Sequence, residues 1–401
     1  MPSRLMASLA LAVLVAGVGA AATAGAASPA KPRARDLGVP FDGTPGPLNA
    51  ITDVEGVLVG HTTLISGDGR LVVGKGPIRT GVTAVLPRDL AGMMSHFAFA
   101  GWYAQNGSGE MTGTAWVEES GFLEGPVMIT NTHSVGVVHD AVIAWRVAHG
   151  PADATDYWWS TPVVAETWDG WLNDINGFHV KPEHVFRALE SAHGGAVEEG
   201  NVGGGTGMIC YGFKGGIGTS SRKLPEKDGG YTVGVLAQCN YSGSSRRNLR
   251  IAGIPVGREI PGTEPYTGLP SDLAEGGSII VVVATDAPLL PHQLKRIARR
   301  VTLGLGRTGA IGGNDSGDLF IAFSTGNPRA SEIDHGPVDV RMVPNDSMDP
   351  LFAATVQATE ESIVNAMVAA TDMTGVDGHQ VQALPHAALR AVLARYNRLV
   401  K

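Results

Sequence analysis

Glu275-Gly276-Gly277-Ser278-Ile279-Ile280-Val281-Val282-Val283 joins a glycine pair, a serine and a run of β-branched residues. Consecutive Ile and Val residues are typical of a buried strand. Glycine adopts backbone conformations that are closed to other residues, so the Gly-Gly step lets the Ser278 hydroxyl attack the preceding carbonyl. If that bond breaks, Ser278 becomes an N-terminus with a hydroxyl nucleophile and, as its base, an α-amine of pKa roughly 7.7–8.0. The alternative is an ordinary loop that enters a core strand.

The composition indicates a compact, turn-rich globular enzyme. The 401 residues are 43% hydrophobic and 17% charged, and 55 of them are glycine, about twice the usual share of ~7%. Acidic residues outnumber basic ones by 38 to 30. Because a nucleic-acid-binding face is expected to be basic, we expect no nucleic-acid partner. No internal repeat and no break in composition divides the chain, which favours one mixed α/β domain.

The N-terminus has the pattern of an export signal. An apolar run from Ala7 to Val18 is followed by small residues that fit cleavage after Ala24 or Ala26. The run is shorter than the ~20 apolar residues of a membrane-spanning helix. We therefore expect a periplasmic or secreted protein that is free of the membrane once the signal is removed. The expected parts are a signal peptide over 1–27, a mobile leader over 28–48 and one domain over 49–401.

The chain has two cysteines, Cys210 and Cys239, and both lie in apolar runs beside glycine-rich turns. Export permits a disulfide between them. We expect two buried thiols instead, although the sequence leaves the pairing open.

Apolar periodicity predicts strands in the first half of the chain and an alternation of strands and helices after Ser278. The expected strands lie at 57–59, 81–86, 127–130, 162–165, 208–211, 231–239, 279–283 and 318–324. The expected helices begin near 140 and 291 and cover about 184–193, 351–371 and 385–396.

Several familiar motifs fail on their context. Gly304–Gly309 fits the dinucleotide-binding glycine pattern, but it ends a predicted helix where the motif needs a preceding strand. His133 and His139 have no partners at ligand spacing, so we expect no metal. Asp315-Ser316-Gly317 resembles the serine motif of trypsin-like proteases without the histidine and aspartate motifs of that fold. No GxSxG sequence supports an α/β-hydrolase.

Polar residues lie at the ends of three predicted strands, next to glycines. Glu166 follows the strand at 162–165, Asn240 follows the strand at 231–239, and Ser316 and Asp318 flank a glycine at the start of the strand at 318–324. Each alone is ordinary turn chemistry. Together with Ser278 they can converge on one pocket, which is the arrangement that a hydrolase needs.

Longer blocks of sequence surround these residues. They are Asn131–Gly136, Pro162–Gly170, Leu172–His179, Gly200–Met208, Phe213–Gly218, Leu249–Gly253, Gly277–Pro288 and Ser316–Asp318. In these blocks the chain resembles the self-processing N-terminal-serine aminopeptidases, an S58-like family of L-aminopeptidase/D-esterase/D-amidase enzymes with β-peptidyl aminopeptidase relatives. The resemblance extends from about Asn49 to Leu393.

The resemblance implies a precursor that cleaves itself between Gly277 and Ser278 into an α chain (49–277) and a β chain (278–401). It implies a four-layer αββα sandwich that resembles N-terminal nucleophile hydrolases and is formed from the two chains of one precursor. It also implies a homo-oligomer of αβ heterodimers and no cofactor.

The resemblance assigns catalytic roles to four residues. Ser278 is the nucleophile and its freed amine the base. Ser316 is a second serine that helps proton movement, and Asp318 behind it orients that hydroxyl and stabilises positive charge on the amine. Asn240 supplies an amide N–H to the oxyanion.

Two further residues are assigned to substrate binding. Glu166 holds the free amino group of the substrate through a charge-assisted hydrogen bond. Trp168 stands where several relatives have tyrosine, and because an indole N–H donates but does not accept, a role that needs a phenol is in doubt there.

The leading hypothesis is an exported serine aminopeptidase that acts on short peptides, amides or esters with a free amino group. A β-peptidyl aminopeptidase, or an amidase, acylase or lactam-cleaving enzyme, on the same scaffold is an alternative. An unprocessed binding protein is another. The sequence does not separate L-α, D-α and β-amino residues as substrates, because one methylene changes binding by only ~1–3 kcal/mol.

Overall fold

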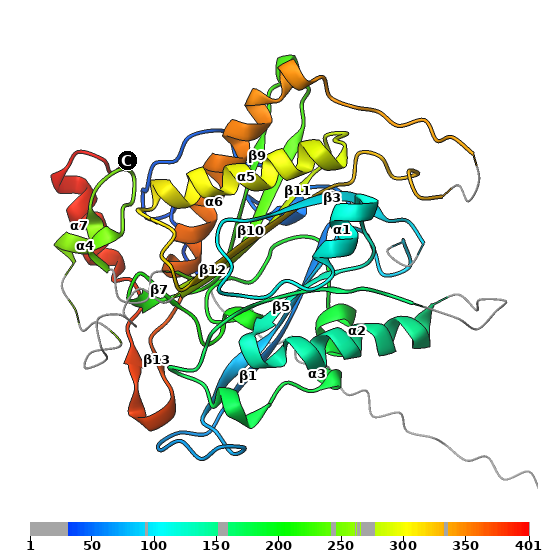
Figure 1. The fold of residues 1–401 in the computed structure, drawn as a ribbon. Helices are drawn as coiled ribbons and strands as arrows, with labels where there is room; N and C mark the ends of the chain where they lie inside the picture. The colour runs from blue at the N-terminus through cyan, green and yellow to red at the C-terminus, as the bar shows by residue number, and fades with distance from the viewer. Residues whose placement is uncertain are drawn as a thin grey trace, which may run out of the picture. The chain divides into compact units, whose positions relative to one another are not determined.

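Two β-sheets packed face to face form the centre of the protein (Figure 1). The structure is a computed structural model that describes residues 31–92, 95–150, 159–241, 246–260, 262, 265, 277–332 and 336–400. Within these residues, one sheet has four strands in the order β1 (Leu58–Ser66), β2 (Ile78–Leu86), β5 (Val127–Asn131) and β6 (Val163–Thr167). The other has six, in the order β4 (Phe122–Leu123), β3 (Ala98–Ala104), β12 (Ser316–Ser324), β11 (Gly277–Thr285), β10 (Thr232–Asn240) and β9 (Gly216–Lys223).

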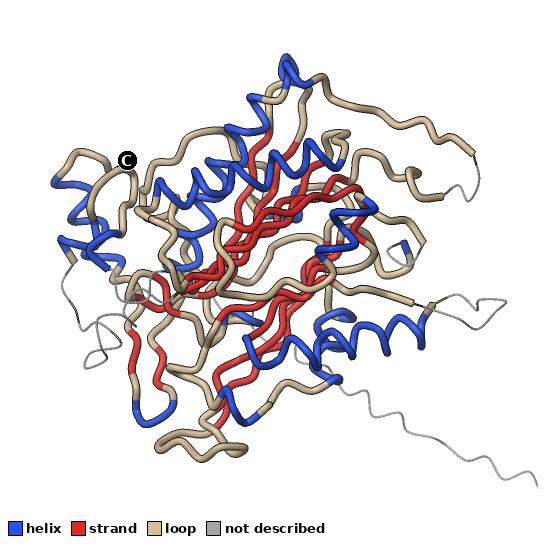
Figure 2. Tube along the Cα trace, in the orientation of Figure 1, coloured by secondary structure: helices blue, strands red, loops and turns tan. Residues whose placement is uncertain are grey.

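Helices cover the outer faces of both sheets (Figure 2). On the six-stranded sheet lie α5 (Pro291–Arg307) and α6 (Asp349–Val368), and on the four-stranded sheet lie α2 (Val135–His149) and α3 (Pro182–Glu190). The layers therefore run helix, sheet, sheet, helix, as the αββα prediction requires. The β5–β6 and β11–β12 pairs are parallel, and the other ladders of the two sheets are antiparallel.

Strand β11 runs through the interior of the six-stranded sheet between β10 and β12. Ile279 and Val281 pack toward α5 and α6, whereas Ile280 and Val282 pack against the four-stranded sheet. All four are 0% exposed. Burial on both faces explains why this strand is an unbroken apolar run instead of an alternating one.

Three strands of this sheet were not predicted: the two-residue β4 and the longer β3 and β9. The two longer strands share one feature. Each carries a glycine on which a helix packs directly: a Cβ at Gly101 of β3 would lie 2.5 Å from the backbone nitrogen of Lys295 in α5, and a Cβ at Gly218 of β9 would lie 2.0 Å from the carbonyl oxygen of Ser362 in α6. In β9 Ile217 is the only apolar side chain, so this strand lacks the pattern by which strands are recognised. In contrast, β3 contains Phe99, Trp102 and Tyr103, which favour a strand, and this signal was missed.

Shorter elements complete the described chain. They are α1 (Thr114–Ser120), α4 (Val256–Glu259), α7 (His386–Arg395), β7 (Ile209–Cys210), β8 (Phe213–Lys214), β13 (Met373–Thr374) and β14 (Gln380–Val381). Contacts group Pro32–Lys401 into one compact unit. None of the helices in the described ranges is both long and apolar enough to cross a membrane. The predicted signal peptide, Glu275 and Gly276 lie outside the described residues.

Cys210 and Cys239 form a disulfide, so the expectation of two free thiols is wrong. Cys210 ends β7 and Cys239 lies in β10, and both are 0% exposed. Their Cα atoms are 5.8 Å apart, which is within the range that a disulfide spans. The two cysteines are 29 residues apart in the sequence, which gave no sign of this proximity. The β9–β10 ladder returns Cys239 beside Gly216, close to the β7–β8 hairpin that carries Cys210.

The segment predicted as a mobile leader is packed on the domain from Arg33 onward. Ala34, Leu37 and Val39 belong to the core beneath α6 and α7. Arg33 forms an ion pair with Glu199 at 2.7 Å. The prediction of a mobile leader is therefore wrong for this part of 28–48, because its apolar residues alternate with arginines that find buried carboxylates.

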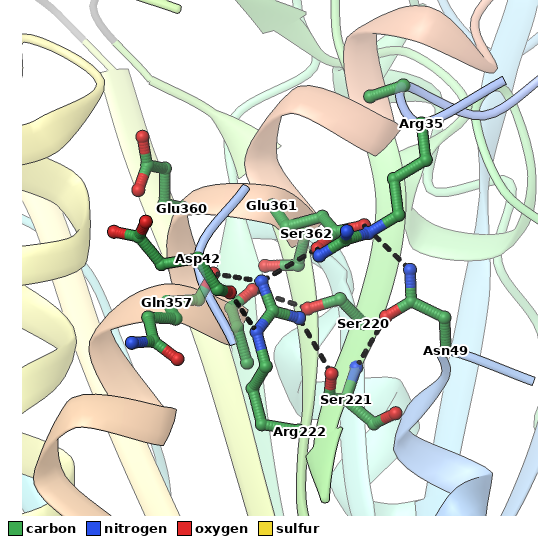
Figure 3. A network of polar contacts seen from close by, with 12 residues as sticks. Arg35, Asp42, Asn49, Ser220, Ser221, Arg222, Gln357, Glu360, Glu361 and Ser362 are labelled. Atoms are coloured by element: carbon green, nitrogen blue, oxygen red, sulfur yellow. Dashed lines mark hydrogen bonds and ion pairs between the residues drawn. The ribbon is translucent and has the colours of Figure 1, made fainter. Parts of the chain in front are cut away.

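One of these carboxylates, Glu361 on α6, joins three separate parts of the chain (Figure 3). It accepts hydrogen bonds from Arg35 at 2.7 and 2.8 Å, from Asn49 at 2.6 Å and from Arg222 at 2.7 Å. Burial alone would raise the pKa of Glu361, but the hydrogen bond from Arg35 and the charges of Arg222 and Arg35 outweigh it and lower the pKa. The contacts link residues before the predicted cleavage bond to a helix that follows it.

Candidate active site

Ser278 is the second residue of β11, at the end of the sheet where β10 finishes. The strand register pairs it with Asn240 on one side and Gly317 on the other. Ser278 is 6% exposed, and its Oγ accepts a hydrogen bond from the backbone N–H of Gly317 at 3.2 Å. Gly277 begins the strand and pairs with Ser316. The two residues of the predicted cleavage bond thus pair with two of the other predicted catalytic residues, Asn240 and Ser316.

Asn240 shares a face of the sheet with Ser278, because directly opposed residues point to the same side. This face carries Ile280 and looks toward the four-stranded sheet. The Oδ1 of Asn240 accepts the backbone N–H of Ile209 at 2.8 Å, and its Nδ2 donates to the carbonyl oxygen of Trp168 at 2.9 Å. These contacts orient the amide, and its nitrogen keeps a second hydrogen for an incoming oxyanion.

Ser316 and Asp318 lie on the other face of the sheet. They alternate with Gly317 along β12, so both side chains point to the same face of the sheet. Asp318 pairs with Ile279, which packs toward the helices, so this face is the one that the helices cover. Ser316 opposes Gly277, the residue that cleavage would remove from the strand. Its hydroxyl therefore lies level with the scissile bond, where a freed α-amine would form.

Asp318 is fully buried within a hydrogen-bond network. Its Oδ1 accepts the Ser316 hydroxyl at 2.6 Å and its Oδ2 accepts Nδ2 of Asn106 at 3.2 Å. Burial raises the pKa of Asp318 to about 6, although these hydrogen bonds oppose the rise. Asn106 also accepts the backbone N–H of Asp318 at 2.7 Å. Sequence reasoning missed Asn106, because it lies in the loop after an unpredicted strand and belongs to no motif.

Glu166 lies in β6 and is 3% exposed. Its Oε1 accepts the backbone N–H of Glu110 at 3.0 Å, and its Oε2 accepts the hydroxyl of Thr132. Burial raises the pKa of Glu166, and both hydrogen bonds oppose the rise. A carboxylate offers about four lone-pair positions, so two remain for a substrate ammonium. Thr132 was not predicted as a site residue, although it belongs to one of the blocks on which the family resemblance rested.

Aromatic side chains are exposed near Glu166. Trp168 follows it by two residues and is 43% exposed, while its carbonyl holds Asn240. His133, which follows Thr132 in the chain, stacks on Phe178 with ring centroids 6.1 Å apart. Among the described residues, the indole of Trp168 makes no hydrogen bond to the catalytic residues, so Trp168 contributes its backbone carbonyl, which orients Asn240.

The segment Ser108–Glu110 joins the two halves of the site. At one end, the N–H of Ser108 donates to the carbonyl of Ser316 at 3.3 Å. At the other end, the N–H of Glu110 donates to Glu166. The segment thus spans from β12 of the six-stranded sheet to β6 of the four-stranded sheet. Among the residues described, no group of three or more His, Cys, Asp or Glu side chains is placed to hold a metal ion.

Comparison with known proteins shows the family of this chain. The model of peptidase family S58 matches residues 49–381. The chain belongs to peptidase family S58. It is 56% identical over 385 residues to the beta-peptidyl aminopeptidase BapA of Sphingosinicella microcystinivorans, covering 94% of this chain and 95% of that protein.

Solved structures of similar proteins share the fold. The L-aminopeptidase D-Ala-esterase/amidase of Ochrobactrum anthropi is 50% identical with a TM-score of 0.84, covering 92% of this chain and 100% of that one. A beta-aminopeptidase of Burkholderia sp. is 48% identical with a TM-score of 0.81, covering 90% and 98%. The Ochrobactrum enzyme is described as a serine aminopeptidase and a new variant of the Ntn hydrolase fold. This S58 member is therefore a hydrolase of the serine aminopeptidase type, and the predicted family, fold and enzyme class are confirmed.

Proposed function

We propose that this S58 aminopeptidase cleaves its own Gly277–Ser278 bond and then removes N-terminal β-amino residues from short peptides and amides. The observation that carries the proposal is the position of Ser278, buried at the start of β11 with its hydroxyl on the N–H of Gly317 and beside the Asn240 amide. The name of a relative that is 56% identical over nearly the whole chain favours β-amino substrates. Export and assembly into a homo-oligomer of processed units belong to the same proposal.

The first step is self-processing. The Ser278 hydroxyl attacks the carbonyl carbon of Gly277, the C–N bond breaks, and the proton lost by the hydroxyl passes to the departing nitrogen, which becomes the α-amine of Ser278. Water then hydrolyses the ester between Gly277 and Ser278. The products are a Gly277 carboxylate and a free N-terminal serine. Ser316 loses its strand partner in this step, which opens a path for its hydroxyl to the new amine.

The second step is hydrolysis of the substrate. The α-amine of Ser278 takes the hydroxyl proton as Oγ attacks the substrate carbonyl, and Asn240 donates to the developing oxyanion. The protonated amine then gives its proton to the leaving amine, and water hydrolyses the acyl-enzyme. The ionised Asp318, through Ser316, favours the protonated form of the α-amine between these events.

Glu166 would select substrates with a free amino group. A buried carboxylate that already accepts two hydrogen bonds is rigid and has two remaining acceptor positions. An ammonium compensates its buried charge, whereas an N-acylated substrate leaves the carboxylate unpaired. This favours an aminopeptidase over an acylase that acts on blocked amines.

Denaturing mass spectrometry of the wild type beside Ser278→Ala tests the proposal. The wild type is expected to give a fragment of residues 278–401, and Ser278→Ala a single intact chain. Ser278→Cys retains a nucleophile and is expected to process, which separates loss of chemistry from misfolding. The purified proteins are then assayed on the para-nitroanilides of β-alanine and L-alanine. A wild type that remains one chain and hydrolyses neither substrate contradicts the mechanism and supports an unprocessed binding protein.

A further inference from the structure

We propose that Gly109 determines specificity by setting the span between the ammonium-binding carboxylate of Glu166 and the nucleophile Ser278. This inference rests on the proposed function, in which the enzyme grips the substrate at its amino group and attacks its carbonyl. The number of bonds between these two groups distinguishes an α-amino residue from a β-amino residue. The span that the protein imposes is therefore a direct means of choosing between them.

Gly109 lies between the Glu166 carboxylate and Gly317, the strand partner of Ser278. A Cβ at this residue would be 3.1 Å from Oε1 of Glu166 and 3.0 Å from Cα of Gly317. The same Gly317 donates its N–H to Ser278 Oγ. Gly317 approaches Gly109 just as closely, since a Cβ at Gly317 would be 2.8 Å from Cα of Gly109. Two glycine backbones thus pack against each other, with the carboxylate on one side and the nucleophile on the other.

Hydrogen bonds hold the residues around Gly109 in defined positions. The flanking residues Ser108 and Glu110 are fixed by hydrogen bonds to Ser316 and Glu166 at 3.3 and 3.0 Å. Glu166 is held again by Thr132, and Gly317 is part of the central strand β12. The short segment therefore acts as a spacer between β12 and β6. The solvent-exposed position of Gly109 leaves its outer side open to the substrate.

A methyl group at Gly109 would lengthen this span. Contacts of 3.0–3.1 Å are tighter than ordinary van der Waals contact, so the carboxylate and the β12 backbone must separate by a few tenths of an ångström. A longer span disfavours the short α-amino substrate more than the β-amino substrate, which has one more methylene. One methylene is worth about 10–200-fold in discrimination, so a partial shift should raise the β-to-α ratio of kcat/KM at least about threefold.

The test compares Gly109→Ala with Gly107→Ala in the same loop. A Cβ at Gly107 meets nothing within 4 Å, and neither glycine has a positive φ, so alanine is not strained by the backbone at either position. Self-cleavage is checked by mass spectrometry, and kcat/KM is measured on the para-nitroanilides of β-alanine and L-alanine. We expect the ratio to rise in Gly109→Ala and to equal that of the wild type in Gly107→Ala. An unchanged ratio in Gly109→Ala, or an equal loss on both substrates, overturns the proposal.

A second measurement needs no variant. A fixed span predicts that the wild type prefers one chain length in the series glycine, β-alanine and 4-aminobutyrate, assayed as amides, with kcat/KM at least about tenfold lower for the neighbouring lengths. If the self-cleaved enzyme hydrolyses all three amides with similar kcat/KM, the proposal that Gly109 sets a fixed span is overturned. A wild type that neither cleaves itself nor hydrolyses any of them overturns the proposed function instead, so the two failures are distinct.

Discussion

Replacing Glu361 by glutamine should destabilise the protein by about 3 kcal/mol, near the lower end of the roughly 3–5 kcal/mol lost when one partner of a buried ion pair is removed. The side chain keeps its size but loses the charge that faces Arg222, which is 1% exposed. Arg222 retains the carbonyl oxygens of Asp42, Ser221 and Gln357 at 2.7–3.1 Å, which limits the loss. Arg35 is 31% exposed and can be hydrated, so its ion pair with Glu361 contributes little to the loss of stability.

The neighbouring residue provides a matched control. Glu360 has the same side chain one position earlier on α6, but it pairs with Arg307, which is 40% exposed. Glu360→Gln should therefore cost less than about 1 kcal/mol. Urea unfolding followed by circular dichroism gives the free energy of unfolding of each variant, and equal m-values show that the unfolded states are comparable. Native mass spectrometry of processed protein then reports whether the two fragments separate more readily in Glu361→Gln.

The pH dependence gives an independent check on Glu361. Its folded pKa is lowered, so its contribution to stability is present above the ordinary value of 4.5 and is lost as pH falls through the folded pKa. The stability difference between wild type and Glu361→Gln should therefore shrink in acid below about pH 4.5. If Glu361→Gln is as stable as Glu360→Gln at neutral pH, the reasoning from burial and charge is refuted.

Two further predictions concern catalysis. Asn240→Ala should lower kcat by about 100–1,000-fold with little change in KM, because the oxyanion donor acts only in the transition state. Steady-state kinetics on the processed enzyme measure both constants. A raised KM at constant kcat would instead show a role of Asn240 in ground-state binding. Since burial raises the pKa of Asp318 to about 6, its carboxylate is ionised only above that pH, so kcat/KM should rise through about pH 6. Asp318→Asn should remove this limb, and an unchanged pH profile in that variant would exclude Asp318 as its source.

The elements with strong local patterns were predictable. The Ile and Val run of β11 and the amphipathic face of α5 are properties of consecutive residues, and the structure has both elements within a few residues of the predicted bounds. The long helix α6 also lies within a few residues of its predicted bounds. The Gly-Gly-Ser step and the polar residues at strand ends indicated the position of the site for the same reason. By contrast, β9 has Ile217 as its only apolar side chain and packs on α6 through Gly218, and such a contact has no local signature.

The sequence by itself determined the serine at the head of a buried strand and the residue types available to act beside it, because hydrophobicity, chain order and side-chain chemistry are carried by the chain directly. Only the tertiary structure decided that Cys210 meets Cys239, that Asn106 supports Asp318, and that Gly109 separates Glu166 from the strand beside Ser278. These contacts join residues far apart in the sequence. Their distances depend on how the two sheets and their loops pack, and no run of neighbouring residues encodes that packing.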